Sequence, residues 1–283
     1  MYKSMQLLIG CVTAVVIFSV TAWGKGSEMM IIAHRGASRE CPENTLAAVK
    51  RAWEIGADAV EIDVHLSADR KLVVIHDSTT SRTTGRDYVV SETLSSVLCS
   101  LDAGAWKGAS FRGEKIPLLE EVLATLPKGK TLFVEIKSSP ETVGVLKKVL
   151  ERSKAASQVV LISFDLKVIE AASRELPNIR RYWLRGTLKD EATSAPLPHP
   201  ATWISMAKAA GAHGLDLHYA GMTADFVKAV REAGMELYVW TVNDPEIAKQ
   251  MHALQCDGLT TDDPRAMLKL FGRAPKTVEK RPR

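Results

Sequence analysis

The chain has 283 residues, 46% of them hydrophobic, and a formal net charge of +4. This length is sufficient for one large domain with a full hydrophobic core or for two smaller domains. Both signs of charge are spread along the chain, which excludes the concentrated basic surface typical of nucleic-acid-binding proteins.

The first 24 residues have the outline of a secretory signal peptide. Residues 5–23 carry no charge, follow Lys3, and end in small residues that offer cleavage sites after Ala22 or Gly24. We therefore expect residues 1–24 to direct export to the periplasm or the extracellular space. The alternative is an uncleaved membrane anchor, because the apolar run approaches the ~20 residues needed to span a bilayer. Membrane contact is expected only through such a leader.

The opposite end of the chain, residues 272–283, is basic and predicts a flexible tail. The cysteines are Cys11, Cys41, Cys99 and Cys256, and they form neither a CxxC motif nor a Cys/His zinc spacing. A metal would therefore be bound by oxygen ligands. Cys41 and Cys99 could pair in an oxidising compartment, and the sequence leaves that question open.

Residues 60–65 form the most informative stretch. Apolar residues alternate there with Glu61, Asp63 and His65. This period of two predicts a strand with one apolar and one ionisable face. The connection that follows is too short for a helical crossover, so the next strand should return antiparallel and place His76 opposite Glu61.

Strand and helix patterns alternate through the rest of the chain. Besides the antiparallel strand at 72–76, we expect strands at 29–33, 60–65, 131–137, 159–163, 180–184, 213–217, 236–241 and 258–260. A helix is expected after each of them, at 42–55, 118–125, 141–151, 166–175, 201–210, 224–233, 245–254 and 264–271. This pattern predicts a (β/α)8 TIM barrel over residues 29–271, with an antiparallel hairpin strand and a small inserted cap at about 78–116.

Ionisable residues gather at the expected carboxyl ends of these strands, where barrel enzymes have their active sites. Glu61, Asp63 and Glu135 would bring three carboxylates together, and they cannot all stay ionised without a countercharge. One divalent cation, Ca²⁺ or Mg²⁺, suits such an all-oxygen ligand set. The alternative is an ion-pair cluster with Arg35 and Lys137. Beside a cation, these two basic residues would form a phosphate-binding pair.

His34 and His76 are expected to approach the same site from different elements. Two imidazoles beside a bound phosphate suit a phosphodiester displacement, in which one acts as base and the other as acid. Trp240 is expected to form a wall of the pocket, with a place in the barrel core as the alternative. His218 is a weaker candidate for contact with substrate.

These residues occur in the motifs AHRGAS, PENTLAAV, AVEIDVHLSADRKLVVIHD, FVEIKS, VVLISFD, YVWTVND and DGLTTDDP. In this order the chain closely resembles the glycerophosphodiester phosphodiesterases, members of the phospholipase C-like phosphodiesterase barrels. The resemblance extends from about residue 30 to residue 270. It implies hydrolysis of deacylated phospholipids, such as glycerophosphocholine, to an alcohol and sn-glycerol 3-phosphate, with Ca²⁺ or Mg²⁺ as cofactor.

The resemblance also implies roles for individual residues, and the segment at 78–116 lies where the family carries its insertion. The matching positions are the catalytic pair His34 and His76, the metal ligands Glu61, Asp63 and Glu135, and the phosphate-binding residues Arg35 and Lys137.

Two other functions stay open at this point. A phospholipase of the sphingomyelinase D or phosphatidylinositol type would share the metal site but act on intact lipid. A non-catalytic phosphate-binding barrel would bind diesters without turnover, and the histidine pair argues against it. The sequence does not predict an oligomeric state.

Overall fold

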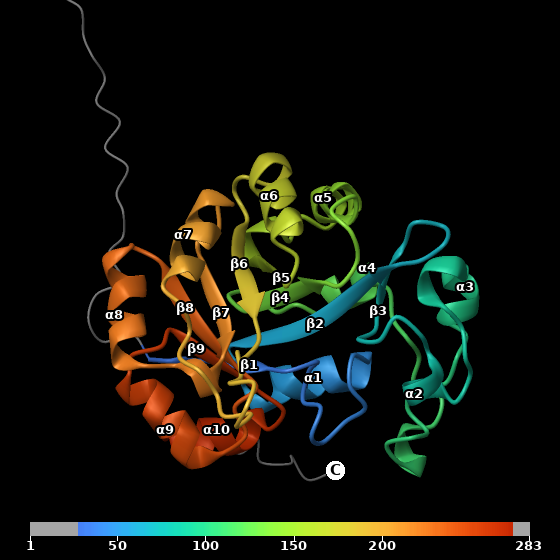
Figure 1. The fold of residues 1–283 in the computed structure, drawn as a ribbon. Helices are drawn as coiled ribbons and strands as arrows, with labels where there is room; N and C mark the ends of the chain where they lie inside the picture. Colours follow the sequence, from blue (N-terminus) through green and yellow to red (C-terminus); the bar gives the residue numbers. More distant parts are fainter. Residues whose placement is uncertain (1–27, 274–283) are drawn as a thin grey trace, which may run out of the picture.

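Eight parallel strands form a closed barrel surrounded by helices (Figure 1), as the sequence predicts. The computed structural model describes residues 28–273, so the predicted leader and most of the predicted basic tail lie outside the described residues. The barrel strands are β1 (Met30–Ala33), β2 (Ala59–Leu66), β4 (Thr131–Ile136), β5 (Val159–Ser163), β6 (Arg180–Arg185), β7 (Gly214–His218), β8 (Glu236–Trp240) and β9 (Gly258–Thr261).

The barrel closes because β1 pairs with strands from both ends of the sheet. Ile32 lies opposite Thr260 of β9 on one side and opposite Ala59 of β2 on the other. All eight strands therefore begin at one end of the barrel and finish at the other, so side chains at their carboxyl ends share one rim.

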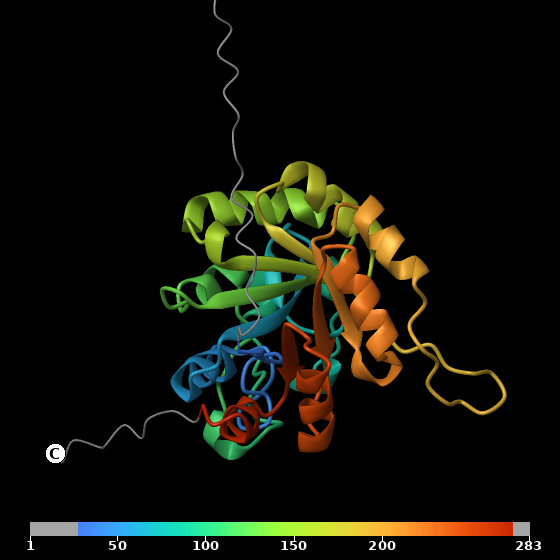
Figure 2. The same cartoon turned by 90° about the vertical axis from the view of Figure 1, so that its left-hand side faces the viewer.

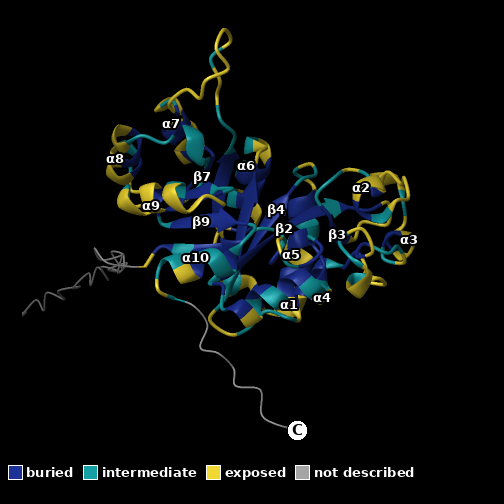
Figure 3. Cartoon of the chain, turned by 90° about the horizontal axis from the view of Figure 1, so that it is seen from below, coloured by how far each residue is buried: buried dark blue, intermediate teal, exposed yellow. Residues whose placement is uncertain are grey.

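A helix follows each strand and covers the outside of the barrel. These helices are α1 (Leu46–Ile55), α4 (Leu119–Leu123), α5 (Thr142–Ser153), α6 (Leu166–Glu175), α7 (Thr202–Ala209), α8 (Ala224–Glu232), α9 (Pro245–Ala253) and α10 (Pro264–Leu270), with short 3-10 turns at η3 (Ala156–Gln158) and η4 (Tyr219–Gly221). Their inner faces are buried against the strands and their outer faces are exposed (Figure 3). Asp and Thr side chains cap several of these helices by accepting first-turn N–H groups, as Asp165 and Thr223 do.

The first helix begins later than the sequence predicts. We expected it to start at Pro42, but α1 starts at Leu46 after the N-cap Thr45. Asn44 cannot join the helix, because its backbone has a positive φ of 57° and its side-chain amide donates to Asp63 Oδ2 at 2.8 Å. Asn44 of the PENTLAAV motif therefore stays outside the helix and binds a carboxylate at the rim of the barrel.

The predicted hairpin forms, with a register one residue away from the expected one. The return strand β3 (Leu72–Val74) is antiparallel to β2 and pairs Val74 with Val64. The turn is closed by Ser67 and Lys71, so it is centred on Asp69 rather than between Ala68 and Asp69. The pairing of His76 with Glu61 is therefore wrong, and His76 lies beyond the end of β3.

The inserted segment at 78–116 packs beside β3 at one side of the barrel (Figure 1). It contains only short elements, α2 (Ser81–Thr84), η1 (Val90–Glu92), α3 (Ser95–Leu98) and η2 (Ala109–Phe111). A separate apolar cluster, which includes Val73, Ile75, Val90 and Leu98, lies between the segment and β3. This cluster anchors the segment independently of the main core.

Aromatic rings fill the interior of the barrel. Tyr182 and Tyr238 stack with ring centroids 4.8 Å apart, and Phe133 packs against both. The rings close the inside of the barrel below the rim, so a ligand can enter only from the carboxyl ends of the strands.

A long loop between β6 and α7, residues 186–201, projects from the barrel (Figure 2). Within residues 28–273, no helix has both the length and the apolar character needed to cross a bilayer. Cys41, Cys99 and Cys256 are all free, so the Cys41–Cys99 pair does not form in this structure.

Candidate active site

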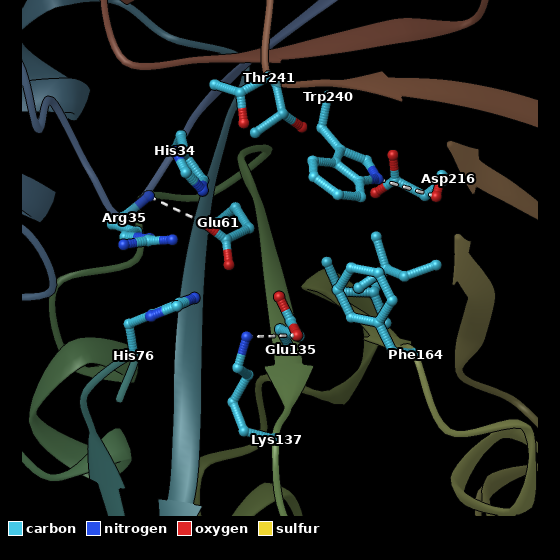
Figure 4. A pocket seen from close by; sticks show the side chains of 13 residues that line it. His34, Arg35, Glu61, His76, Glu135, Lys137, Phe164, Asp216, Trp240 and Thr241 are labelled. Atoms are coloured by element: carbon cyan, nitrogen blue, oxygen red, sulfur yellow. Dashed lines mark hydrogen bonds and ion pairs between the residues drawn. The ribbon is translucent and has the colours of Figure 1, made fainter. Parts of the chain in front are cut away.

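A cavity of about 220 Å³ opens at the carboxyl ends of the strands, where the sequence places the site. His34, Arg35, Glu61, His76, Glu135, Lys137 and Trp240 all line it (Figure 4). Asp63, the remaining predicted residue, is buried beside them with 1% exposure. The structure therefore brings the whole predicted set together.

The HRG motif makes a tight turn immediately after β1. Arg35 has a φ of 54°, and its backbone N–H donates to Glu61 Oε2 at 2.9 Å. Gly36 has a φ of 80°, and a Cβ there would lie 2.5 Å from the Ala48 carbonyl carbon. Only glycine fits this close approach to α1, and the turn directs the Arg35 amide at a carboxylate.

Glu61, Asp63 and Glu135 form a compact buried cluster. Each offers one carboxylate oxygen, and these oxygens lie within 4.8 Å of one another. Glu61 and Asp63 share one face of β2, while Glu135 is paired with Asp63 on the neighbouring strand β4. This is the geometry that the alternating pattern at residues 60–65 predicts.

The cluster has fewer countercharges than it needs. Arg35 Nε lies 3.3 Å from Asp63 Oδ2, and Lys137 Nζ lies 2.9 Å from Glu135 Oε1. The sequence left open an ion-pair cluster with Arg35 and Lys137 as the alternative to a cation site, and part of that cluster is therefore present. However, neither basic side chain is paired with Glu61 among the described residues, and the buried Glu61 Oε1 accepts no hydrogen bond there.

The resulting pKa shifts have clear causes. Burial, followed by repulsion from Asp63 and Glu135, raises the pKa of Glu61 well above its usual range. Burial and then repulsion from Asp63 raise the pKa of Glu135 to about 7. Burial alone would raise the pKa of Asp63 too, but the charges of Arg35 and Lys137 lower it. A buried all-oxygen cluster with excess negative charge fits a hard divalent cation.

Each cavity histidine is held by an aspartate. His34 Nδ1 donates to Asp262 Oδ1 at 2.6 Å, and His76 Nδ1 donates to Asp77 Oδ1 at 2.6 Å. A carboxylate acceptor at Nδ1 fixes the ring orientation and leaves Nε2 as the free nitrogen. Both rings point towards the part of the cavity that Glu61 borders (Figure 4).

Sequence reasoning missed these two aspartates. Asp77 directly follows His76 in the HD motif, so its role could have been suspected. Asp262 lies 228 residues from His34, and its Oδ2 accepts from Asn243 at 2.6 Å. In the sequence, the polar residues that follow β8 and β9 were the signal from which Asp262 could have been found.

A further network links His76 to the phosphate-binding candidate Arg35. Arg82, on α2 of the inserted segment, donates to both carboxylate oxygens of Asp77 and of Glu43. Glu43 Oε1 also accepts from Arg35 Nη1 at 2.9 Å. The inserted segment therefore takes part in the support of the site.

The opposite wall of the cavity is largely apolar. Phe164 and Trp240 meet edge to face with centroids 5.5 Å apart, and both line the cavity. Trp240 also packs against the interior cluster of the barrel, so it belongs to the wall and to the core. His218 packs edge to face against Trp240 with ring centroids 5.4 Å apart, and it is not among the residues that line the cavity.

Comparison with known proteins identifies the family. The model of the glycerophosphoryl diester phosphodiesterase family matches residues 34–266. The chain belongs to this family. It is therefore an enzyme of the phosphoric diester hydrolase class.

Three relatives illustrate how far the likeness extends. The chain is 34% identical over 246 residues to a glycerophosphodiester phosphodiesterase of Caldanaerobacter subterraneus, covering 85% of this chain and 97% of the relative. It is 30% identical over 265 residues to one from Bacillus subtilis, covering 85% and 86%. An Oleispira antarctica phosphodiesterase, solved in complex with the product sn-glycerol-3-phosphate, superimposes with a TM-score of 0.78 at 29% identity, covering 86% of this chain and 96% of that one.

Proposed function

We propose that this glycerophosphodiester phosphodiesterase converts glycerophosphodiesters, such as glycerophosphocholine, to an alcohol and sn-glycerol 3-phosphate by metal-dependent, two-histidine catalysis. One observation carries the proposal. Two imidazoles, each held at Nδ1 by an aspartate, border the same cavity as a buried carboxylate cluster that lacks enough countercharge. The complex of the Oleispira antarctica relative with sn-glycerol-3-phosphate supports the product.

The phosphate group would be held by Arg35 and Lys137. Both side chains line the cavity and are mostly buried, at 18% and 17% exposure. Contact with carboxylates raises the pKa of each despite burial, so both stay charged. A guanidinium can grip two phosphate oxygens at once, and the ammonium adds a point charge on the other side.

The histidines would transfer protons at Nε2. One accepts the proton of the attacking hydroxyl as its oxygen bonds to phosphorus, and the other donates a proton to the leaving alkoxide as the phosphorus–oxygen bond breaks. Asp77 and Asp262 stabilise whichever imidazolium forms. The attacking hydroxyl belongs either to water or to the neighbouring glycerol carbon, and trapping of a cyclic phosphate would distinguish the two.

Glu61, Asp63 and Glu135 would hold one divalent cation, Ca²⁺ or Mg²⁺. When bound, such an ion supplies charge stabilisation to a phosphoryl oxygen. The fit rests on the oxygen-only donor set and on the buried Glu61 Oε1, which has no partner among the described residues.

The decisive experiment is a substrate panel. Release of sn-glycerol 3-phosphate from glycerophosphocholine would be measured with Ca²⁺, with Mg²⁺ and after EDTA treatment. Activity that survives thorough chelation would contradict the metal role. Faster turnover of lipid vesicles than of water-soluble diesters would favour a phospholipase of the sphingomyelinase D or phosphatidylinositol type, and tight binding without turnover would favour a non-catalytic barrel.

We also propose that the enzyme is exported. The support is the leader pattern at residues 1–24, in which Lys3 precedes an uncharged run at residues 5–23 and a cleavage site; this segment lies outside the described residues. Fractionation of producing cells tests the proposal, because enzyme found only in the cytosol at full length would contradict it.

A further inference from the structure

Asp216 is a buried carboxyl group that the proposed chemistry does not use. It lies on β7 between Leu184 of β6 and Tyr238 of β8, and it has 1% exposure. Its Oδ1 has no hydrogen-bond partner among residues 28–273. A buried oxygen without a hydrogen-bond partner destabilises the fold, so its presence needs an explanation.

The surroundings of Asp216 indicate what kind of hydrogen-bond partner its side chain lacks. It lines the same cavity as the metal-ligand candidates, but on the side of Phe164 and Trp240 and away from Arg35 and His76 (Figure 4). Ile162 and Leu184 also line the cavity and belong with Trp240 to one apolar cluster, so the carboxyl group of Asp216 lies beside a largely apolar wall. Trp240 Nε1 donates to the backbone carbonyl of Asp216 at 3.0 Å, which fixes the two strand ends together.

The position separates Asp216 from the cation cluster. The atoms grouped as a metal site belong to Glu61, Asp63 and Glu135, and Asp216 is not among them. Burial, followed by repulsion from Glu135, raises the pKa of Asp216 to about 8, so near neutral pH its carboxyl group can donate as well as accept a hydrogen bond.

We propose that Asp216 binds a hydroxyl group of the glycerol moiety and thereby selects substrates with a polyol next to the phosphate. This inference rests on the proposed function, because it assumes that the phosphate lies at Arg35 and Lys137. A glycerol unit has an apolar carbon edge that suits Phe164 and Trp240, and hydroxyl groups that suit one buried carboxyl. A site built to bind a hydroxyl discriminates strongly against a ligand without one.

The test compares two substrates in Asp216→Asn and Asp216→Leu, two variants of similar size to the original residue. Glycerophosphocholine carries the polyol, and bis(p-nitrophenyl) phosphate does not. For Asp216→Leu, we expect the loss of kcat/KM on glycerophosphocholine to exceed the loss on the aryl diester by ~10-fold or more. For Asp216→Asn, whose amide still makes part of the interaction, we expect the loss of kcat/KM on glycerophosphocholine to exceed the loss on the aryl diester by ~3-fold or more.

Controls distinguish this inference from other roles. Glu135→Gln should reduce both activities alike, and thermal unfolding reports whether each variant folds. Equal losses on both substrates, or no loss on either, would overturn the role of Asp216. So would a tenfold rise in the Ca²⁺ concentration needed for half-maximal activity, because that would make Asp216 a metal ligand.

If Asp216→Leu does not fold, Asp216→Asn alone tests the inference. An unchanged preference of Asp216→Asn for glycerophosphocholine over the aryl diester would overturn it. If the wild-type enzyme releases no sn-glycerol 3-phosphate at all, the proposed function fails first. If the wild-type enzyme releases sn-glycerol 3-phosphate but the Asp216 variants keep its substrate preference, only the assignment of Asp216 is wrong.

Discussion

Arg82 donates to both carboxylate oxygens of Asp77, through Nε to Oδ2 at 2.6 Å and through Nη2 to Oδ1 at 3.2 Å. The same guanidinium donates to both oxygens of Glu43. Arg82, a residue of the inserted segment, thus contacts both the aspartate that binds His76 and the glutamate that binds Arg35.

Arg82→Ala should lower kcat by about 10- to 100-fold, because misplacement of a supporting group weakens the alignment of His76. Loss of the guanidinium also leaves the charge of Asp77 without a cation, which raises the pKa of His76. The limb of the pH–rate profile that His76 controls should therefore move to higher pH. Steady-state kinetics across pH 5–9 would measure both effects.

Arg265 supplies a matched control for this experiment. Its side chain is 43% exposed, against 44% for Arg82, and it also makes a two-atom contact with a glutamate, Glu40. Arg265→Ala should leave kcat and the pH profile nearly unchanged, and Arg82→Lys should fall between the wild type and Arg82→Ala. Identical profiles for Arg82→Ala and Arg265→Ala would show that Arg82 does not position His76.

His34→Ala and His76→Ala should each reduce turnover by ~10²-fold or more, the usual contribution of general acid–base catalysis. Asp262→Asn should also reduce turnover, because an amide no longer enforces donation from His34 Nδ1. Glycerophosphocholine turnover is the measurement, and His252→Ala, an exposed position outside the cavity, is the control. Near wild-type rates in both histidine variants would remove them from the mechanism.

The carboxylate cluster should make cation binding depend on pH. Because the pKa values of Glu61 and Glu135 are raised in the folded protein, their protons stabilise the fold at low pH. The contribution of Glu61 is lost as pH rises well above the usual range of a glutamate, and that of Glu135 is lost as pH rises through about 7. A cation replaces those protons and binds more tightly above that pH. The rise in Tm on adding Ca²⁺ or Mg²⁺ should therefore be larger at pH 8 than at pH 6, and absent in Glu61→Gln. A pH-independent rise would contradict the assignment.

Acid should weaken the fold through the aspartates that hold the histidines. The hydrogen bonds from Arg82 and His76 lower the pKa of Asp77 to about 2, and those from His34, Asn243 and Ser38 lower the pKa of Asp262 to about 2 against the opposing effect of burial. A depressed pKa contributes stability that is present above the unfolded value of ~4 and is lost as pH falls towards 2. Urea unfolding between pH 5 and pH 2.5 should show this decline, and Asp77→Asn with Asp262→Asn should reduce it. An unchanged slope in the double variant would count against the prediction.

The barrel and most of the site could be predicted from the sequence because their signals are local. The alternation around Glu61 and Asp63, and the repeat of strand and helix patterns, follow from the geometry of each element. The carboxyl ends of parallel strands then necessarily meet at one rim.

What could not be predicted depends on contacts between distant residues. Asp262 reaches His34 across 228 residues, and Arg82 reaches Glu43 across 39, with no local pattern to reveal either pair. The hairpin register depended on a turn centred on Asp69, half a residue from the expected centre. Asp216 did have a signal, since an acidic residue between Leu215 and Leu217 repeats the alternation seen at residues 60–65.

Both ends of the described chain leave from the closed end of the barrel. Arg273 Nη1 donates to the carbonyl of Met29 just before β1, and the Arg273 guanidinium also pairs with Asp58 just before β2. A bead, fusion partner or surface attached at residue 28 or residue 273 would thus lie behind the barrel, with the mouth facing outward. Immobilised enzyme prepared in this way should keep free access for small dissolved diesters.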